Sequence, residues 1–186
     1  MKKLLFAFCF FIAALANAQD INIMLKEAEN LEFQLKEPES LEKYKQVLTL
    51  DSNNIKALTK CAELTAMIGA RFIKEKEKPY KKSFYQTAYQ YATKAVAKDS
   101  NSADANYVLA FTSNKMGDVE QEQKKLVEYI KDTKKYALKT VSLNANYAKA
   151  NYILGKWNLD MLNLQPFKKA AIKLFYGVPV GILEKA

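Results

Sequence analysis

The hexapeptide Ala105-Asn106-Tyr107-Val108-Leu109-Ala110 returns almost unchanged, 45 residues later, as Ala150-Asn151-Tyr152-Ile153-Leu154-Gly155. A weaker copy, Ala57-Leu58-Thr59-Lys60-Cys61-Ala62, lies 48 residues before the first. Each copy follows a short polar link, and these links are Asp51–Asn54, Asp99–Ser102 and Asn144–Tyr147. Recurrence at this spacing is typical of stacked supersecondary units, none of which can bury its apolar face alone. The sequence therefore predicts a repeat architecture.

Apolar residues at three- and four-residue spacing, together with Pro, Asp, Asn and Gly at the breaks, predict helices throughout. We expect them at about Asp20–Lys36, Pro38–Leu50, Asn54–Ala70, Pro79–Lys98, Ala103–Met116, Val119–Val141, Tyr147–Leu162 and Pro166–Tyr176. The predicted fold is all-α, a tetratricopeptide-like α-solenoid of about four antiparallel helix pairs. Its units exceed the usual length of about 34 residues, and longer second helices account for the excess.

Small residues recur where two helices of such a repeat would cross. Ala62, Ala110 and Gly155 hold this position, and an apolar residue precedes each of them: Cys61, Leu109 and Leu154. A small side chain lets two backbones approach, and the apolar neighbour fills the space between the helices. We therefore expect three close crossings.

The first 18 residues have the order of a secretory signal peptide. Two lysines precede an apolar run from Leu4 to Leu15, and Ala16-Asn17-Ala18 follows. The alternative, a membrane anchor, needs roughly 20 apolar residues, and this run is shorter. We expect cleavage after Ala18 and an exported protein, periplasmic or secreted, whose residues 19–186 form one helical repeat domain.

Charge and cysteine content limit the partners and the chemistry. The chain has a formal net charge of +9, and loss of Lys2 and Lys3 with the leader leaves +7. This balance favours acidic protein segments or anionic lipid head groups as partners. Export and the scatter of lysines over several helices argue against nucleic acid. Cys61 would be the one remaining cysteine, and its apolar-face position favours a buried structural residue over a reactive thiol.

The residues needed for most catalytic sites are missing from the sequence. There is no histidine, so the commonest general base and metal ligand is absent. One cysteine cannot build a thiolate metal site, and no glycine-rich phosphate loop or nucleophile elbow occurs. We expect no enzyme, no cofactor and no metal. A hydrolase that uses carboxylates alone is a residual alternative.

A binding groove is better supported, because the first helix of each pair lines the concave wall of a tetratricopeptide stack. Helical spacing then selects the inward positions, which are Lys56, Lys60, Glu63, Asp104, Tyr107, Phe111, Asn114, Lys149, Tyr152 and Lys156. Lysines flanking tyrosines would suit an acidic peptide or a carboxylate terminus. The alternatives are that Tyr107 and Tyr152 only pack between helices and that the lysines are ordinary surface residues.

The segment Phe167–Phe175 is basic and amphipathic. One interpretation places it on an anionic membrane. The other makes it the closing helix of the last pair. Trp157, the only tryptophan, is predicted to be a packing anchor.

The C-terminal third resembles the regulator of microtubule dynamics family. The resemblance is carried by Tyr152-Ile153-Leu154-Gly155-Lys156-Trp157, by Leu164 and Phe167–Pro179, and by Tyr91–Ser102 upstream. It implies a tetratricopeptide-like scaffold without catalytic residues; animal relatives are associated with microtubules or with membrane contact and lipid binding. The family usually continues with a further helix after the proline segment, so we expect Gly181–Ala186 to begin that helix.

The combined prediction is a non-enzymatic exported scaffold that binds a protein or peptide in its concave groove. The alternative function is binding of a lipid or anionic amphiphile at the envelope membrane surface. The sequence does not decide the oligomeric state.

Overall fold

The computed structural model describes residues 20–163 and residue 177. Within these residues the regular structure is entirely helical, as predicted. Residues 20–33 are helical, and the further helices are α2 (Glu37–Leu50), α3 (Ile55–Ala70), the short 3₁₀ helix η1 (Glu75–Glu77), α4 (Lys78–Lys98), α5 (Ala103–Gly117), α6 (Gln123–Leu143) and α7 (Ala148–Asn163). The predicted signal peptide, the segment Pro166–Tyr176 and the expected start of a helix at Gly181–Ala186 lie outside the described residues.

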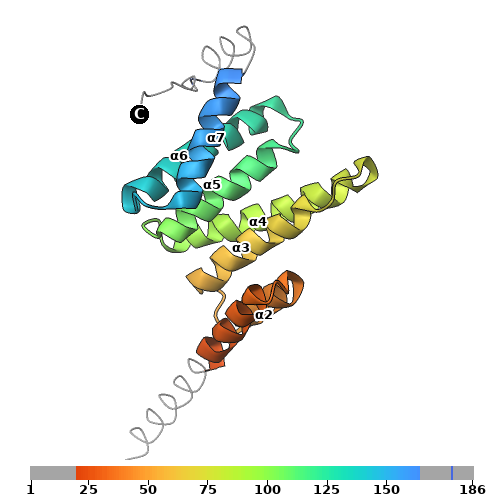
Figure 1. Ribbon diagram of the computed structural model, residues 1–186, viewed down its shortest axis with the longest axis vertical. Helices are drawn as coiled ribbons and strands as arrows, with labels where there is room; N and C mark the ends of the chain where they lie inside the picture. Colours follow the sequence, from red (N-terminus) through yellow and green to blue (C-terminus); the bar gives the residue numbers. More distant parts are fainter. Residues whose placement is uncertain (1–19, 164–176, 178–186) are drawn as a thin grey trace, which may run out of the picture.

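Successive helices pack as antiparallel pairs that stack into a tetratricopeptide-like solenoid (Figure 1). The pairs are residues 20–33 with α2, α3 with α4, and α5 with α6, and α7 packs on α6. The first helices also contact one another across the stack, α3 against α5 and α5 against α7. These contacts place the first helices side by side along one wall of the solenoid.

The three polar links share one geometry, which explains their recurrence in the sequence. Asp51, Asp99 and Asn144 each end a second helix in an extended conformation, as the C-caps of α2, α4 and α6. Each side-chain oxygen accepts the backbone N–H two residues later, at 2.8–3.1 Å. This local hydrogen bond favours a turn over further helix. The links therefore reverse the chain in the same way at each repeat.

Side chains in two of the links also start the next helix. Asn54 Oδ1 accepts the N–H of Ala57 at 3.1 Å, and Ser102 Oγ accepts that of Ala105 at 3.2 Å. Each bond satisfies one of the free amide groups at a helix N-terminus. These caps confirm that the polar links set the helix starts.

The asparagine of the repeated hexapeptide fastens its helix to the preceding link. Asn106 Nδ2 donates to the carbonyl oxygens of Ser100 at 2.9 Å and Ser102 at 2.7 Å. Asn151 Nδ2 makes the matching bond to the Ala145 carbonyl at 3.0 Å. The side chain of Asn106 is buried and that of Asn151 is exposed.

We therefore expect Asn106→Ala to lower the free energy of unfolding by about 1–2 kcal/mol, because two carbonyl groups lose a donor that water replaces poorly at a buried site. Asn151→Ala is the matched control and should cost about half as much or less, since its single bond is exposed. Urea unfolding of both variants measures the difference. Equal losses would contradict this role for Asn106.

Two of the three expected helix crossings are confirmed. Ala62 and Ala110 are fully buried and share one core cluster with Ala92 and Ala137. Cys61 and Leu109, which precede them, are buried as well. The third crossing was wrong, because Gly155 is exposed and a Cβ built on it would meet no atom within 4 Å.

A different glycine marks a close approach that the sequence analysis missed. A Cβ built on Gly69 in α3 would lie 2.7 Å from Cβ of Phe84 and 3.2 Å from the Tyr85 ring in α4. Only glycine leaves room for α4 at this separation. Gly69 and Gly117 occupy equivalent repeat positions, 48 residues apart, and this periodicity was the available signal.

Two helix boundaries differ from those expected. The helix over residues 20–33 ends early because Leu35 takes a positive φ of 58°. There the N–H groups of Leu35 and Lys36 bond back to Glu32 and Leu31, both at 2.9 Å, which is a common way to end a helix.

Helix α6 begins at Gln123 and not near Val119. The cause is local, since Glu120 Oε1 accepts the N–H groups of Gln121 at 2.9 Å and Glu122 at 3.1 Å. These bonds hold the chain in a turn before the helix starts.

Cys61 is a buried structural residue, as predicted. Its side chain is fully buried, and burial raises the pKa of the thiol to about 12. Since the thiolate is the reactive form, this thiol is inert near neutral pH. None of the helices in the described ranges combines the length and the apolar character needed to cross a membrane.

Candidate functional site: a charged groove along the first helices

A groove of about 620 Å³ runs across three successive first helices. It is lined by Ile55, Lys56, Thr59, Lys60 and Glu63 from α3, by Asp104, Tyr107 and Val108 from α5, and by Tyr147 and Lys149 at the start of α7. Six of the ten predicted inward residues thus lie together: Lys56, Lys60, Glu63, Asp104, Tyr107 and Lys149. Residue spacing along a helix was enough to find them.

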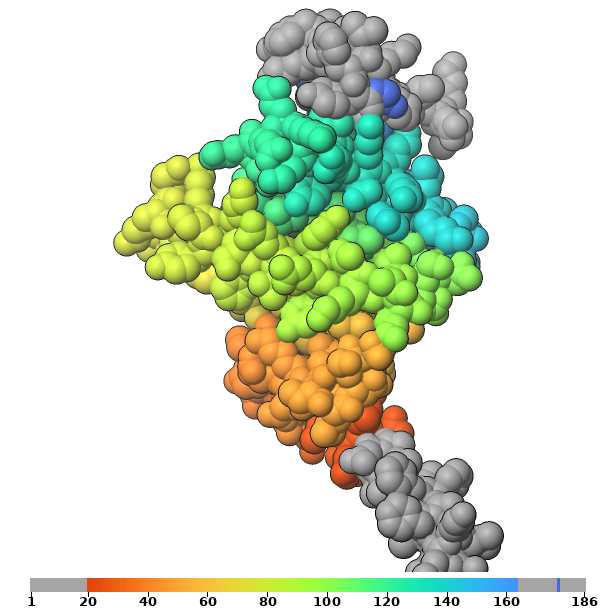
Figure 2. All heavy atoms as spheres, turned by 180° about the vertical axis from the view of Figure 1, so that it is seen from behind, coloured from red at the N-terminus to blue at the C-terminus, as the bar shows by residue number. Residues whose placement is uncertain are grey.

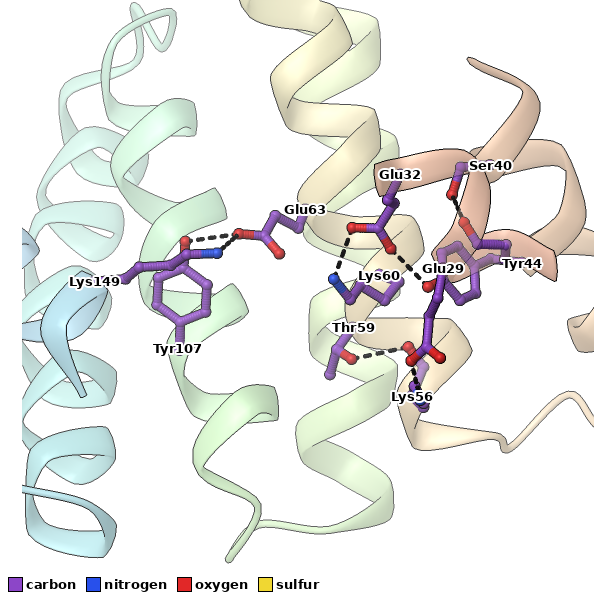
Figure 3. A network of polar contacts seen from close by, with 11 residues as sticks. Glu29, Glu32, Ser40, Tyr44, Lys56, Thr59, Lys60, Glu63, Tyr107 and Lys149 are labelled. Atoms are coloured by element: carbon purple, nitrogen blue, oxygen red, sulfur yellow. Dashed lines mark hydrogen bonds and ion pairs between the residues drawn. The ribbon is translucent and has the colours of Figure 1, made fainter. Parts of the chain in front are cut away.

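A three-residue cross-brace holds the middle of the groove (Figure 3). Glu63 on α3 accepts the hydroxyl of Tyr107 on α5 at 3.1 Å and the ammonium of Lys149 on α7 at 2.7 Å. The Glu63 side chain is 13% exposed and that of Lys149 is 61% exposed. The ammonium can therefore leave the carboxylate for solvent or a ligand, while Tyr107 continues to satisfy Glu63.

The preceding first helix supplies carboxylates to the other two lysines. Lys60 pairs with Glu32 at 2.8 Å, and Lys56 pairs with Glu29. Glu32 also accepts the Tyr44 hydroxyl at 2.6 Å, so it repeats the tyrosine–carboxylate–lysine arrangement of the cross-brace (Figure 3). All three groove lysines are therefore paired within the chain.

Burial keeps the groove tyrosines neutral. It is the largest cause of the raised pKa of Tyr107, and the Glu63 charge adds to it. Burial also raises the pKa of Tyr147, whose hydroxyl donates to Asp104 at 2.7 Å. A neutral phenol next to a carboxylate is a hydrogen-bond donor, so these tyrosines orient the carboxylates.

The charges around the groove nearly cancel. Three lysines face four carboxylates, namely Glu29, Glu32, Glu63 and Asp104. In the described part of the chain no cation pairs with Asp104, which is exposed. The groove is therefore slightly acidic on a protein whose net charge is +9.

The other four predicted inward residues lie outside this groove. Phe111 is half-buried and stacks on Tyr107 with ring centroids 6.0 Å apart, whereas Asn114 lines a separate cavity of about 150 Å³ beside Trp157. Tyr152 is 72% exposed and is not part of the groove wall, and Lys156 pairs with Asp160 on its own helix at 2.5 Å. These four residues do not line this groove, and a partner contact at them stays a prediction.

The sequence analysis also missed functional residues. Glu29 and Glu32 lie in the first predicted helix, which had no copy of the repeated hexapeptide. Their pairing with Lys56 and Lys60 depends on how two helices sit side by side, and spacing within one helix does not show this. Tyr147 lies in the last polar link. It stands 45 residues after the capping residue Ser102, which is the repeat spacing, and this spacing could have placed it at the start of a first helix.

Trp157 is a packing anchor, as predicted. It is 3% exposed, packs with Val127 and Met161, and donates from Nε1 to the Ile130 carbonyl at 3.0 Å. Tyr107 is also buried between helices, as the alternative interpretation predicted. It nevertheless forms part of the groove wall.

The described residues offer no obvious metal site, since no three His, Cys, Asp or Glu side chains among them are grouped to hold an ion. The amphipathic segment Phe167–Phe175, on which the lipid alternative rests, lies outside the described residues.

The fold and the groove define the class of protein: a tetratricopeptide-like helical-repeat protein. A solved structure of the first TPR domain of Spaghetti (RPAP3), bound to the HSP90 peptide SRMEEVD, resembles it with a TM-score of 0.59 and 16% identity. That match covers 78% of this chain and 95% of the other. At this identity the likeness shows the fold alone.

The family can now be stated. The chain belongs to the family described as regulator of microtubule dynamics protein 1-3, which matches residues 24–186. A structure of MamA protein also matches, at 17% identity over 87% of this chain and 98% of that chain, but with a TM-score of 0.27. No curated protein matches the chain significantly.

Proposed function

We propose that this chain is a non-enzymatic, exported scaffold that binds a peptide or protein segment in the groove along α3, α5 and α7. One observation carries the proposal: inward-facing side chains from three successive first helices meet in a single groove of about 620 Å³. A recess of this size fits several side chains of an extended segment. The N-terminal leader, with its cleavage point after Ala18, supports export to the periplasm or the medium.

The Lys149 ammonium is the group of this site that a partner can reach most easily. Its side chain is largely exposed, and Glu63 keeps the Tyr107 hydroxyl when Lys149 leaves. A carbonyl or carboxylate of the partner can then take the ammonium at little cost to the fold. The lysines alone suggested an acidic partner. Because four carboxylates and three lysines surround the groove, its net charge does not attract an acidic segment.

A photo-crosslinking amino acid at Ile55, on the groove wall, tests the proposal in the native envelope fraction. We expect a crosslinked partner there and none at exposed Ala97 on the far side of α4. Lys60→Glu with Lys149→Glu should lower the crosslink yield about tenfold, since each new carboxylate faces an existing one.

Lys98→Glu with Lys139→Glu is the matched control, because it makes the same charge change at exposed positions away from the groove. Equal crosslinking at Ile55 and Ala97, or equal losses in the two double variants, would contradict groove binding. Fractionation of the cells that produce this protein tests export. Retention of the protein in the cytoplasm would contradict the proposed export.

A further inference from the structure

The turn between α3 and α4 projects from the solenoid (Figure 2, yellow). The turn and the first residues of α4 read Arg71-Phe72-Ile73-Lys74-Glu75-Lys76-Glu77-Lys78-Pro79-Tyr80-Lys81-Lys82, with six cations and two carboxylates. Arg71 pairs with Glu37 at the start of α2, and Lys82 Nζ lies 3.4 Å from Glu120 Oε1 in the turn between α5 and α6. The turns within successive pairs therefore lie along one edge of the stack, on the same side in Figure 1.

The cations of this edge differ from those of the groove. Among the described residues, the ammonium groups of Lys74, Lys76 and Lys81 form no ion pair, whereas every groove lysine pairs with a carboxylate. Lys74 and Lys76 are exposed and Lys81 is half-buried. Three lysines without an ion-pair partner thus lie together at this edge, beside the turn between α5 and α6.

Apolar side chains accompany the cations. Ile73 is 81% exposed, and it borders a pocket of about 510 Å³ between the two turns. Tyr85 and Val119 supply further apolar wall, and Lys78, Lys81 and Lys82 line the same pocket. Exposed apolar side chains beside a recess commonly mark an interaction site.

The turn is also held in place before any partner arrives. The Phe72 ring lies 5.3 Å from the Phe84 ring and 6.1 Å from the Tyr80 ring, and the Arg71–Glu37 pair fixes its start. A preorganised surface loses less conformational entropy on binding.

We propose that this edge is a second docking surface, separate from the groove, for an acidic protein segment with one apolar side chain. The apolar side chain enters the pocket between Ile73 and Val119, and carboxylates beside it pair with Lys74, Lys76 and Lys81. Asp118 and Glu120 line the pocket interior, and Glu120 is already satisfied by Lys82 and two backbone N–H groups. A recess favours a protruding side chain over a flat bilayer surface.

The probe is a fluorescent peptide in which glutamates flank a single leucine, and its anisotropy is measured with the purified protein. We expect binding that weakens as salt rises. Lys76→Glu with Lys81→Glu should weaken it about tenfold, and Ile73→Ser by a similar factor, given the usual strength of exposed charge pairs and apolar contacts. A peptide with serine in place of leucine should bind as weakly as Ile73→Ser.

Lys98→Glu with Lys139→Glu, exposed and away from this edge, is the control and should change the affinity less than twofold. Amide shifts on peptide addition should be confined to the turns around Ile73 and Val119. Equal weakening in the control, shifts centred on the groove, or no binding would each overturn the proposal. Binding to anionic vesicles with none to the peptide would instead assign the edge to a membrane and overturn it too.

Discussion

Gly69→Ala is expected to lower the free energy of unfolding by about 2 kcal/mol and the melting temperature by roughly 4–8 °C. The added methyl group would lie 2.7 Å from Cβ of Phe84, an atom that cannot move without its backbone. Helix propensity favours alanine by about 1 kcal/mol, so the steric cost must exceed that gain. Helices α3 and α4 would have to separate, and the core between them would loosen.

Gly155→Ala is the matched control, with the opposite sign. Gly155 is also in a helix interior, but it is exposed and has open space at the Cβ position. This variant should gain about 0.5–1 kcal/mol. Thermal and urea unfolding of both variants gives the two values. A Gly69→Ala protein as stable as the parent would show that α3 and α4 do not approach so closely.

The repeat sequence predicted the fold because each repeated residue acts locally or on one neighbouring helix. Asp51, Asp99 and Asn144 make the same bond within three residues, so spacing alone finds them. Ala62 and Ala110 were found because the small residue that lets two helices pack closely recurs at the same place in each repeat. Gly155 followed the same pattern, yet it is exposed. The repeat copies the residues of one helix but not the residues of the helices that would have to pack against it.

The candidate site was predictable only in part, for a related reason. Helical spacing found Lys60 and Lys149, which share a wall, but not the carboxylates that neutralise them. Glu32 and Lys60 are 28 residues apart, and Glu63 and Lys149 are 86 apart. Such pairs depend on the curvature of the stack. They change the chemistry of the groove from basic to nearly neutral, which a residue count along each helix could not show.

The ion pairs also link the proposed function to the fold. Glu63 joins three successive first helices through Tyr107 and Lys149, so the groove width and the stacking of the repeats depend on the same carboxylate. A partner that draws Lys149 away leaves α3 and α5 joined through Glu63 and Tyr107, and α7 stays packed on α5 and α6. Binding can therefore exchange one ion pair without opening the solenoid.

Stability is expected to fall steeply above about pH 10, because burial keeps several phenols neutral and two of them, Tyr44 and Tyr107, lie deep in the fold. Tyr44 and Tyr107 are 0% and 5% exposed, burial and a neighbouring carboxylate raise the pKa of each, and their hydroxyls donate to Glu32 and Glu63. In the unfolded chain a tyrosine loses its proton near pH 10. Above that pH the unfolded state binds fewer protons than the folded state, so the free energy of unfolding decreases as pH rises.

Each buried tyrosine contributes about 1.4 kcal/mol per pH unit above pH 10, or roughly 3 kcal/mol for the two at pH 11. Urea unfolding between pH 7 and pH 11 measures this loss. The comparison with Tyr44→Phe/Tyr107→Phe isolates the phenols, because the two proteins differ only in these two hydroxyl groups. That variant should be about 2 kcal/mol less stable than the parent at pH 7, where Glu32 and Glu63 each lose the hydrogen bond from a buried phenol. It should lose less stability than the parent from pH 10 to pH 11, so that the two curves converge and cross. Parallel curves would show that these hydroxyls reach solvent, and the tyrosine–carboxylate–lysine arrangement of the groove would then be wrong.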